Sequence, residues 1–178
     1  MTKQETYEYL TAHGIDYEVV EHPAVFNMAE AARIHLPHPE ADAKNLFVRD
    51  DKKLHYYMIT VMGDKKVDLK QFRKQNGLRS LSFASADDLM SIMGLIPGAV
   101  TPLGLLNDRE RKVELYLDAA FSELIAVHPN ENTATVLMKT KDLISIITEH
   151  GNRVSVVEMG IPDCLDIAES GIVKADPS

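Results

Sequence analysis

Two apolar runs, AKNLFVRD at 43–50 and LHYYMITVM at 54–62, decide the fold of this chain. The polar triplet DKK at 51–53 separates them, which is a spacing typical of a β-hairpin. Both runs carry apolar side chains at odd and even positions, and such strands usually lie inside a sheet that is covered on both faces. We therefore predict a central hairpin with other elements packed on each side of it.

Cap signals predict the helices around this hairpin. Thr2, followed by Glu5 three residues later, forms a capping-box pattern, and Gly14 ends the same helix. Signals of the same kind place the predicted helices at 2–13, 27–35, 68–77, 85–94 and 140–150.

Short apolar runs predict the remaining strands, at 15–21, 112–117, 124–128, 133–139 and 153–158. Residues 112–117 alternate apolar and polar side chains, which predicts one buried and one exposed face for that strand. Strands in hairpins are interrupted by helices without regular βαβ alternation. This order predicts an α+β domain around a mixed or mostly antiparallel sheet.

The chain has 178 residues, of which 45% are hydrophobic, and this is enough for one compact domain with a sizeable core. We assign the domain to residues 1–160 and leave 161–178 as a C-terminal tail of unassigned role, because the tail has no sustained period. No apolar run approaches the roughly 18 residues of a membrane span, and the N-terminus lacks the hydrophobic stretch of a secretory signal. These features predict a soluble, cytoplasmic protein without a membrane partner.

The formal net charge of −8 limits how the chain can meet nucleic acid. A face that follows a long duplex needs cations clustered over a wide area. We therefore expect no DNA partner. Any contact with RNA should be local, through a small basic opening that binds the end of the RNA.

Lys44 and Asn45 begin an otherwise apolar strand. Lys44 shares a face of that strand with Leu46 and Val48, so its ammonium could emerge at the edge of a covered surface and hold an anionic group such as a phosphate. The structural alternative is a lysine whose aliphatic stem crosses the sheet to bring its charge into water.

Two further places carry residues that packing alone does not demand. The segment GAVTPLG at 98–104 has the form GxxxPxG, whose glycines and proline suit a rigid wall that presents backbone groups to a small substrate, although such loops are usually plain connections. His128, before Pro129, places an ionisable ring beside apolar neighbours at a strand end, although a lone histidine is more often structural. His22, before Pro23, is a similar element with a stronger structural interpretation.

Taken in order along the chain, these segments resemble the YbaK/ProX family of prolyl-tRNA editing domains, and more closely its free-standing ProX (PrdX) branch, which removes alanine from mischarged proline tRNA. The resemblance runs from about residue 3 to about residue 159. It rests on the amino-terminal helix, EHPAVF (21–26), AKNLFVRD (43–50), LRSLSFAS (78–85), GLIPGAVTPLGLLND (94–108), VELYLD (113–118) and LIAVHPNENTATV (124–136). It implies a compact α/β domain with a curved, mixed sheet and helices packed around it.

The resemblance also implies a role for each candidate residue. Lys44 would contact the terminal phosphate or sugar of the tRNA, and Asn45 would help to orient the substrate. His128 corresponds to the histidine of the ProX branch and completes the implied catalytic set. The GxxxPxG loop would form a wall of the aminoacyl pocket, and the implied substrate-binding set is Gly98, Thr101, Pro102, Gly104 and His22.

The implied activity is deacylation of Ala-tRNA(Pro) by a trans-acting hydrolase that positions its substrate without a metal, a cofactor or a covalent nucleophile. An aminoacyl ester is already activated, so a positioned water and a stabilised oxyanion suffice. A pocket that fits alanine excludes the bulkier proline ring. The implied partner is the acceptor end of mischarged tRNA(Pro), with prolyl-tRNA synthetase as a second candidate.

Several alternatives stay open. The chain could instead deacylate Cys-tRNA(Pro), or bind an aminoacylated end without cleaving it. Seven histidines raise the question of a zinc hydrolase, but no HExxH arrangement occurs, and His35 and His38 lie in a proline-flanked loop. Cys164 is the only cysteine and lies in the tail without a placed histidine partner, which argues against cysteine catalysis.

Overall fold

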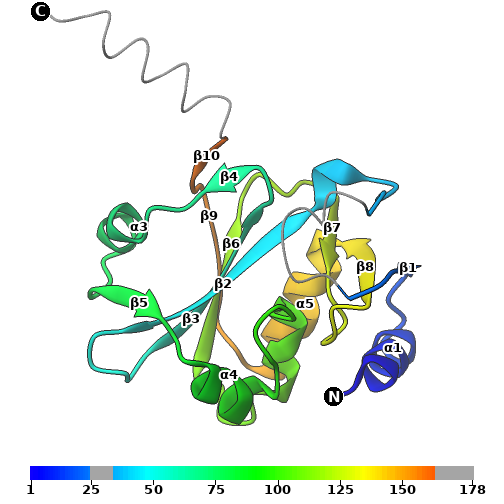
Figure 1. The fold of residues 1–178 in the computed structure, drawn as a ribbon, viewed down its shortest axis with the longest axis horizontal. Coiled ribbons are helices and arrows are strands. Elements are labelled where there is room, and N and C mark those ends of the chain that lie inside the picture. Colours follow the sequence, from blue (N-terminus) through cyan, green and yellow to red (C-terminus); the bar gives the residue numbers. More distant parts are fainter. Residues whose placement is uncertain (25–33, 163–178) are drawn as a thin grey trace, which may run out of the picture.

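The computed structural model describes residues 1–24 and 34–162 (Figure 1). Most of the helix predicted from about residue 27, and the chain beyond Pro162 with Cys164, lie outside the described residues.

The helices follow the predicted cap signals closely. Thr2 accepts a hydrogen bond from the Glu5 amide in a complete capping box, and Gly94 and Gly151 end two further helices in the left-handed conformation. The α-helices are α1 (Lys3–Ala12), α3 (Leu69–Gln75), α4 (Ala86–Met93) and α5 (Thr140–His150), and the 3-10 helices are η1 (Pro39–Ala41) and η2 (Pro102–Asn107).

The strands form three groups. Their bounds are β1 (Tyr17–Glu21), β2 (Ala43–Asp50), β3 (Tyr56–Met62), β4 (Lys65–Lys66), β5 (Leu81–Phe83), β6 (Val113–Asp118), β7 (Leu124–Val127), β8 (Ala134–Lys139), β9 (Val154–Val157) and β10 (Ile161–Pro162). One sheet has the order β5-β2-β3-β6-β9, a second has the order β1-β8-β7, and β10 pairs with β4. Since β3 pairs with β6, and β6 with β9, in parallel while the other pairs are antiparallel, the sheets are mixed and the α+β class is confirmed.

The predicted hairpin lies inside the five-stranded sheet and is covered on both faces, as expected. Side chains of α4, α5 and η2, among them Met93, Leu103 and Leu143, join the core cluster on one face. Phe72 of α3 and Met159 pack against Val48 on the other face. Figure 1 shows α3 on one side of the sheet, with α4 and α5 on the other.

The strand at 113–118 departs from its prediction. Its polar-looking face is buried, because Tyr116 is only 7% exposed and packs edge-on against Phe72, with the ring centroids 5.1 Å apart. The prediction of one exposed face was therefore wrong. A tyrosine ring counts as polar in an alternation pattern, yet it fills the space under α3 as an apolar side chain does.

The ends of some strands also differ from the prediction. Residues 54 and 55 are not part of β3, because the Asp50 carboxylate accepts the Leu54 amide at 2.9 Å and holds these residues in the turn. The short strands β4, β5 and β10 were not predicted, since two or three residues carry no readable period. Strand pairing continues to Pro162, two residues past the boundary that we assigned to the domain.

A buried ion pair joins the parallel part of the sheet to β4. The Asp118 side chain is fully buried and lies 3.0 Å from the ammonium of Lys65, whose side chain is 13% exposed. Asp118 also accepts the backbone amides of Met62 and Ala120 at 3.2 and 3.0 Å, and Lys65 donates to the carbonyl of Met159 at 3.1 Å. This pair fixes β4 against β6.

We expect Asp118→Ala to lower the free energy of unfolding by about 3 to 5 kcal/mol, because it leaves the Lys65 ammonium desolvated without its partner. Urea denaturation followed by circular dichroism would measure the change. Lys112→Ala, which breaks an exposed pair with Glu110 at 2.8 Å, is the control and should cause no measurable loss. Equal effects of the two substitutions would contradict the importance of the buried pair.

Candidate active site

Lys44 and Asn45, near the start of β2, are the first two candidate residues of the site. Consecutive side chains of a strand point to opposite faces of the sheet. Lys44 pairs across the ladder with Val61, which lies in the same cluster as Val48, whereas Asn45 pairs with Thr60. Lys44 and Asn45 therefore belong to different faces of the sheet.

Asn45 ties the hairpin to the glycine-proline loop. Its Oδ1 accepts the Thr60 hydroxyl at 2.8 Å, and its Nδ2 donates to the carbonyl of Val100 at 3.2 Å. A primary amide carries two N–H donors and two acceptor lone pairs. One donor and one lone pair of Asn45 thus have no partner in the described part of the chain.

Thr101 ties the same loop to the end of β7. It is fully buried, and its hydroxyl donates to the carbonyl of His128 at 2.7 Å and accepts the Leu103 amide at 3.3 Å. The loop is consequently held from two directions, by β2 and by the residue that follows β7. Gly98 lies at the exposed start of the loop with φ of 93°, where a side chain would be strained.

Pro102 and Gly104 form the buried base of the loop. A Cβ at position 104 would lie 2.5 Å from Leu95 Cδ1 and 3.4 Å from Met93 Sδ, so only glycine fits without displacing the core. Of the implied wall residues, Gly98 is at the surface, while Pro102 and Gly104 support the loop from behind.

His128 is half-buried, and its hydrogen bond fixes the proton on the ring. Nδ1 lies 2.9 Å from the carbonyl oxygen of Ala134, which can only accept, so Nδ1 carries the hydrogen. In the neutral ring, Nε2 then presents a lone pair, and it has no hydrogen-bond partner within residues 1–24 and 34–162. Burial lowers the pKa of His128, and the nearby His22 lowers it further, against the Ala134 hydrogen bond and Asp42. The ring therefore stays neutral at physiological pH.

His22 stands beside His128, with ring centroids 6.2 Å apart and planes tilted by 60°. Both of its nitrogens are used: Nδ1 lies 2.9 Å from the carbonyl of Pro23, and Nε2 lies 2.9 Å from the Thr135 hydroxyl. His22 is thus fixed in place and borders His128.

Lys44 lies apart from this group. Its ammonium donates to the backbone carbonyl of Lys65, the residue held by Asp118. Among the contacts of the described residues, none joins Lys44 to Asn45, to the loop or to His128. An ammonium has three donors. Two have no partner within residues 1–24 and 34–162.

Sequence reasoning missed Thr60 and Thr135, which orient Asn45 and His22. A threonine in an apolar strand was the available signal, but its partner follows only from the strand register. In the described part of the chain, no three side chains of the metal-binding types are grouped so that they could hold an ion. No helix there is both long enough and apolar enough to cross a membrane.

Comparison with solved structures shows the class of fold. The crystal structure of a proposed trans-editing enzyme for prolyl-tRNA synthetase matches with a TM-score of 0.69 and 20% identity, over 90% of this chain and 98% of the other. The fold is thus the mixed α+β domain of that structure.

Comparison with known sequences shows the family. "Prolyl-tRNA editing protein ProX" of Acetoanaerobium sticklandii is 36% identical over 159 residues, which cover 88% of this chain and 97% of the relative. "Prolyl-tRNA synthetase associated domain-containing protein 1" of Bos taurus is 35% identical over 150 residues, or 80% and 86% of the two chains. Residues 22–146 match the model of the aminoacyl-tRNA editing domain. The chain belongs to the aminoacyl-tRNA editing domain family and is an aminoacyl-tRNA deacylase, which confirms the resemblance.

Asn45→Asp should displace the glycine-proline loop, because a carboxylate cannot donate to the Val100 carbonyl and repels it. We expect hydrogen exchange of the backbone amides in 98–104 to accelerate at least about tenfold, which corresponds to the roughly 1.4 kcal/mol of a lost hydrogen bond. Asn76→Asp is the control, since Asn76 donates to Phe72 at 2.9 Å at the end of α3. If the loop amides exchanged at the same rate in both variants, the Asn45 hydrogen bond would not be what holds the loop.

The His128 imidazole should titrate with a midpoint below 6.5, since burial penalises the charged ring. Its Nε2 lone pair is then available at neutral pH and is lost as the pH falls through that midpoint. NMR titration of the ring resonances would measure this, and His22→Gln should raise the midpoint, because the neighbouring His22 lowers the pKa of His128. A wild-type midpoint above 6.5 would rule out a neutral ring held by burial.

Proposed function

We propose that this chain is a trans-acting editing hydrolase that removes alanine from mischarged tRNA(Pro). The relative at 36% identity is named as a prolyl-tRNA editing protein, which supports tRNA(Pro) as the substrate. The observation that carries the proposal is the double tie of the glycine-proline loop, to Asn45 at 3.2 Å and to His128 at 2.7 Å. These two hydrogen bonds bring β2, the glycine-proline loop and the end of β7 together, although the three segments are distant in sequence.

The chemistry needs positioning more than a strong nucleophile. An aminoacyl ester is already activated, so the site has to orient a water and stabilise the developing oxyanion. His128 Nε2 accepts a hydrogen from the water or from the amino group, and the remaining N–H of Asn45 donates to the reacting end. The neighbouring ribose hydroxyl of the RNA can share in the proton transfer.

Lys44 takes the terminal phosphate or sugar in this proposal. The 3′ end would have to pass beside the first residues of β2, where β5 no longer pairs with the strand, because Lys44 and Asn45 occupy opposite faces. Binding at one point on each face would fix the direction of the RNA strand. The ester is then presented on the Asn45 side while its phosphate stays on the Lys44 side.

Selectivity follows from size. A cavity shaped for alanine rejects the larger proline ring, so correctly charged tRNA survives. We place this activity in the cytoplasm, where tRNA is charged, with prolyl-tRNA synthetase as a candidate partner. Removal of cysteine in place of alanine is the competing specificity.

Incubation of the purified chain with alanyl, cysteinyl and prolyl forms of tRNA(Pro), with ester loss measured over time, tests the proposal. We expect rapid loss of alanine, slower loss of cysteine and no loss of proline, and unchanged rates in the presence of a chelator. Fastest loss of cysteine would change the assigned specificity. Absence of any ester loss would refute the function.

Lys44→Ala should reduce this deacylation by about 10²-fold, because a substrate that loses its anchor is displaced from the reactive geometry. Circular dichroism should show an unchanged fold, since Lys44 makes one hydrogen bond to a backbone carbonyl. Lys141→Ala is the matched control, because Lys141 is an exposed lysine on α5. Full activity of Lys44→Ala would remove Lys44 from the site.

A further inference from the structure

The segment KKVDLKQFRK at 65–74 is the most cationic stretch of an otherwise acidic chain. It holds five lysines and arginines and one aspartate, while the whole chain has a net charge of −8. Lys65 is paired with Asp118, and Asp68 caps α3 by accepting the amides of Lys70 and Gln71. The remaining positive charge therefore lies largely on α3.

Lys70, Arg73 and Lys74 make no ion pair with another residue in the described part of the chain. Their spacings of three and four residues bring like charges together, which destabilises a helix. Arg73 and Lys74 are favoured by the helix dipole in the last turn, but Lys70 stands in the first turn, where a cation is unfavourable. The stability of α3 thus does not account for this cluster.

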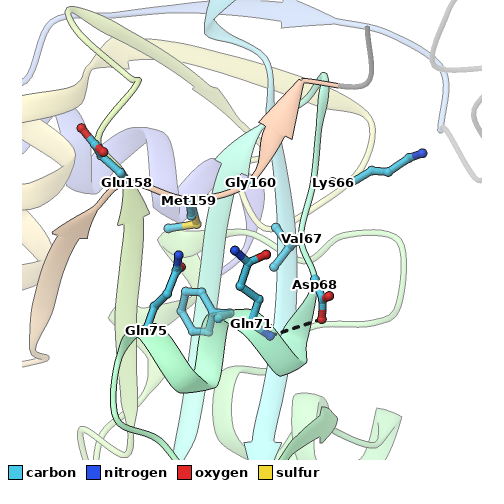
Figure 2. A pocket seen from close by; sticks show the side chains of 9 residues that line it. Lys66, Val67, Asp68, Gln71, Gln75, Glu158, Met159 and Gly160 are labelled. Atoms are coloured by element: carbon cyan, nitrogen blue, oxygen red, sulfur yellow. Dashed lines mark hydrogen bonds between the residues drawn. The ribbon is translucent and has the colours of Figure 1, made fainter. Parts of the chain in front are cut away.

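A pocket of about 470 Å³ adjoins α3 (Figure 2). The side chains of Gln71 and Gln75 lie one turn apart on the flank of the helix beside it, and neither amide has a hydrogen bond within the described residues. Phe72 and Met159 are its buried apolar lining, and the carboxylates of Asp68 and Glu158 also line it. Free amides offer donors for phosphate oxygens and acceptors for ribose hydroxyls.

This surface lies on the same side of the sheet as Lys44. Phe72 of α3 packs in the cluster that includes Val48, whose side of β2 Lys44 shares. The Lys44 ammonium also contacts the carbonyl of Lys65, four residues before α3 begins. An RNA whose terminal phosphate meets Lys44 could therefore continue along α3.

We propose that the solvent side of α3, through the exposed Lys70 and Lys74 and the half-buried Arg73 with the side-chain amides of Gln71 and Gln75, binds the sugar–phosphate backbone of the tRNA acceptor arm. This inference rests on the proposed function. Phosphate contacts of this kind fix the register of an RNA without reading its sequence. They would explain how an acidic chain holds tRNA through one small basic surface.

The test is the triple variant Lys70→Glu, Arg73→Glu and Lys74→Glu. Binding of uncharged tRNA(Pro) should weaken at least about 30-fold at low salt, and the slope of log K against log salt should fall by about 2 to 3, near one for each lost phosphate contact. Deacylation of full-length Ala-tRNA(Pro) should lose a similar factor in kcat/KM. Deacylation of a short oligonucleotide that ends in the alanyl ester should be unchanged, because it does not reach α3.

The matched control is Arg109→Glu, Lys139→Glu and Lys141→Glu, which makes the same change of net charge at three exposed positions elsewhere. Equal tRNA affinity of the two triple variants would overturn the proposal. It would also be overturned if the α3 variant kept its affinity for tRNA but lost binding to an acidic protein. The corresponding glutamine variant replaces the glutamate variant if circular dichroism shows unfolding. Failure of the wild type to cleave either ester would refute the proposed function alone, since binding of uncharged tRNA still tests this surface.

Discussion

The alternation of side chains along β2, a strand covered on both of its faces, governs the rest of the structure. Since neighbouring residues must point in opposite directions, Asn45 meets the glycine-proline loop and Lys44 meets β4. A shift of one residue in the register with β3 would exchange the two side chains and bury the ammonium. The hairpin therefore decides which face of the sheet carries Asn45 and which carries Lys44. It also forms the centre of the core.

The loop between α4 and β6 depends on this arrangement. Two side-chain hydrogen bonds fix it to the rest of the domain, one from Asn45 of β2 to its backbone and one from its own Thr101 to the carbonyl of His128. Glycine at 104 lets η2 lie directly on Leu95 and Met93. The rigidity that positioning catalysis requires thus comes from packing and from two cross-links between segments distant in sequence.

Local signals predicted what local forces determine. The capping box at Thr2, the glycine at 94 and the bounds of β2 are confirmed because each depends on residues within one turn or one strand. The burial of Tyr116 and the orientation of Asn45 by Thr60 depend on partners that only the assembled sheets bring close. The resemblance supplied the family, whereas the opposite faces of Lys44 and Asn45 and the proton position on His128 required the structure.

The close fit at Gly104 has a consequence for how such a chain can change over generations. A larger residue at this position meets the tip of the Leu95 side chain, which has to shift or become smaller to make room. A smaller residue at 95 alone would leave a cavity beside Gly104, so substitutions at the two positions are coupled. Libraries that randomise the loop to alter its substrate should accordingly mutate both positions in the same clones, or keep both fixed.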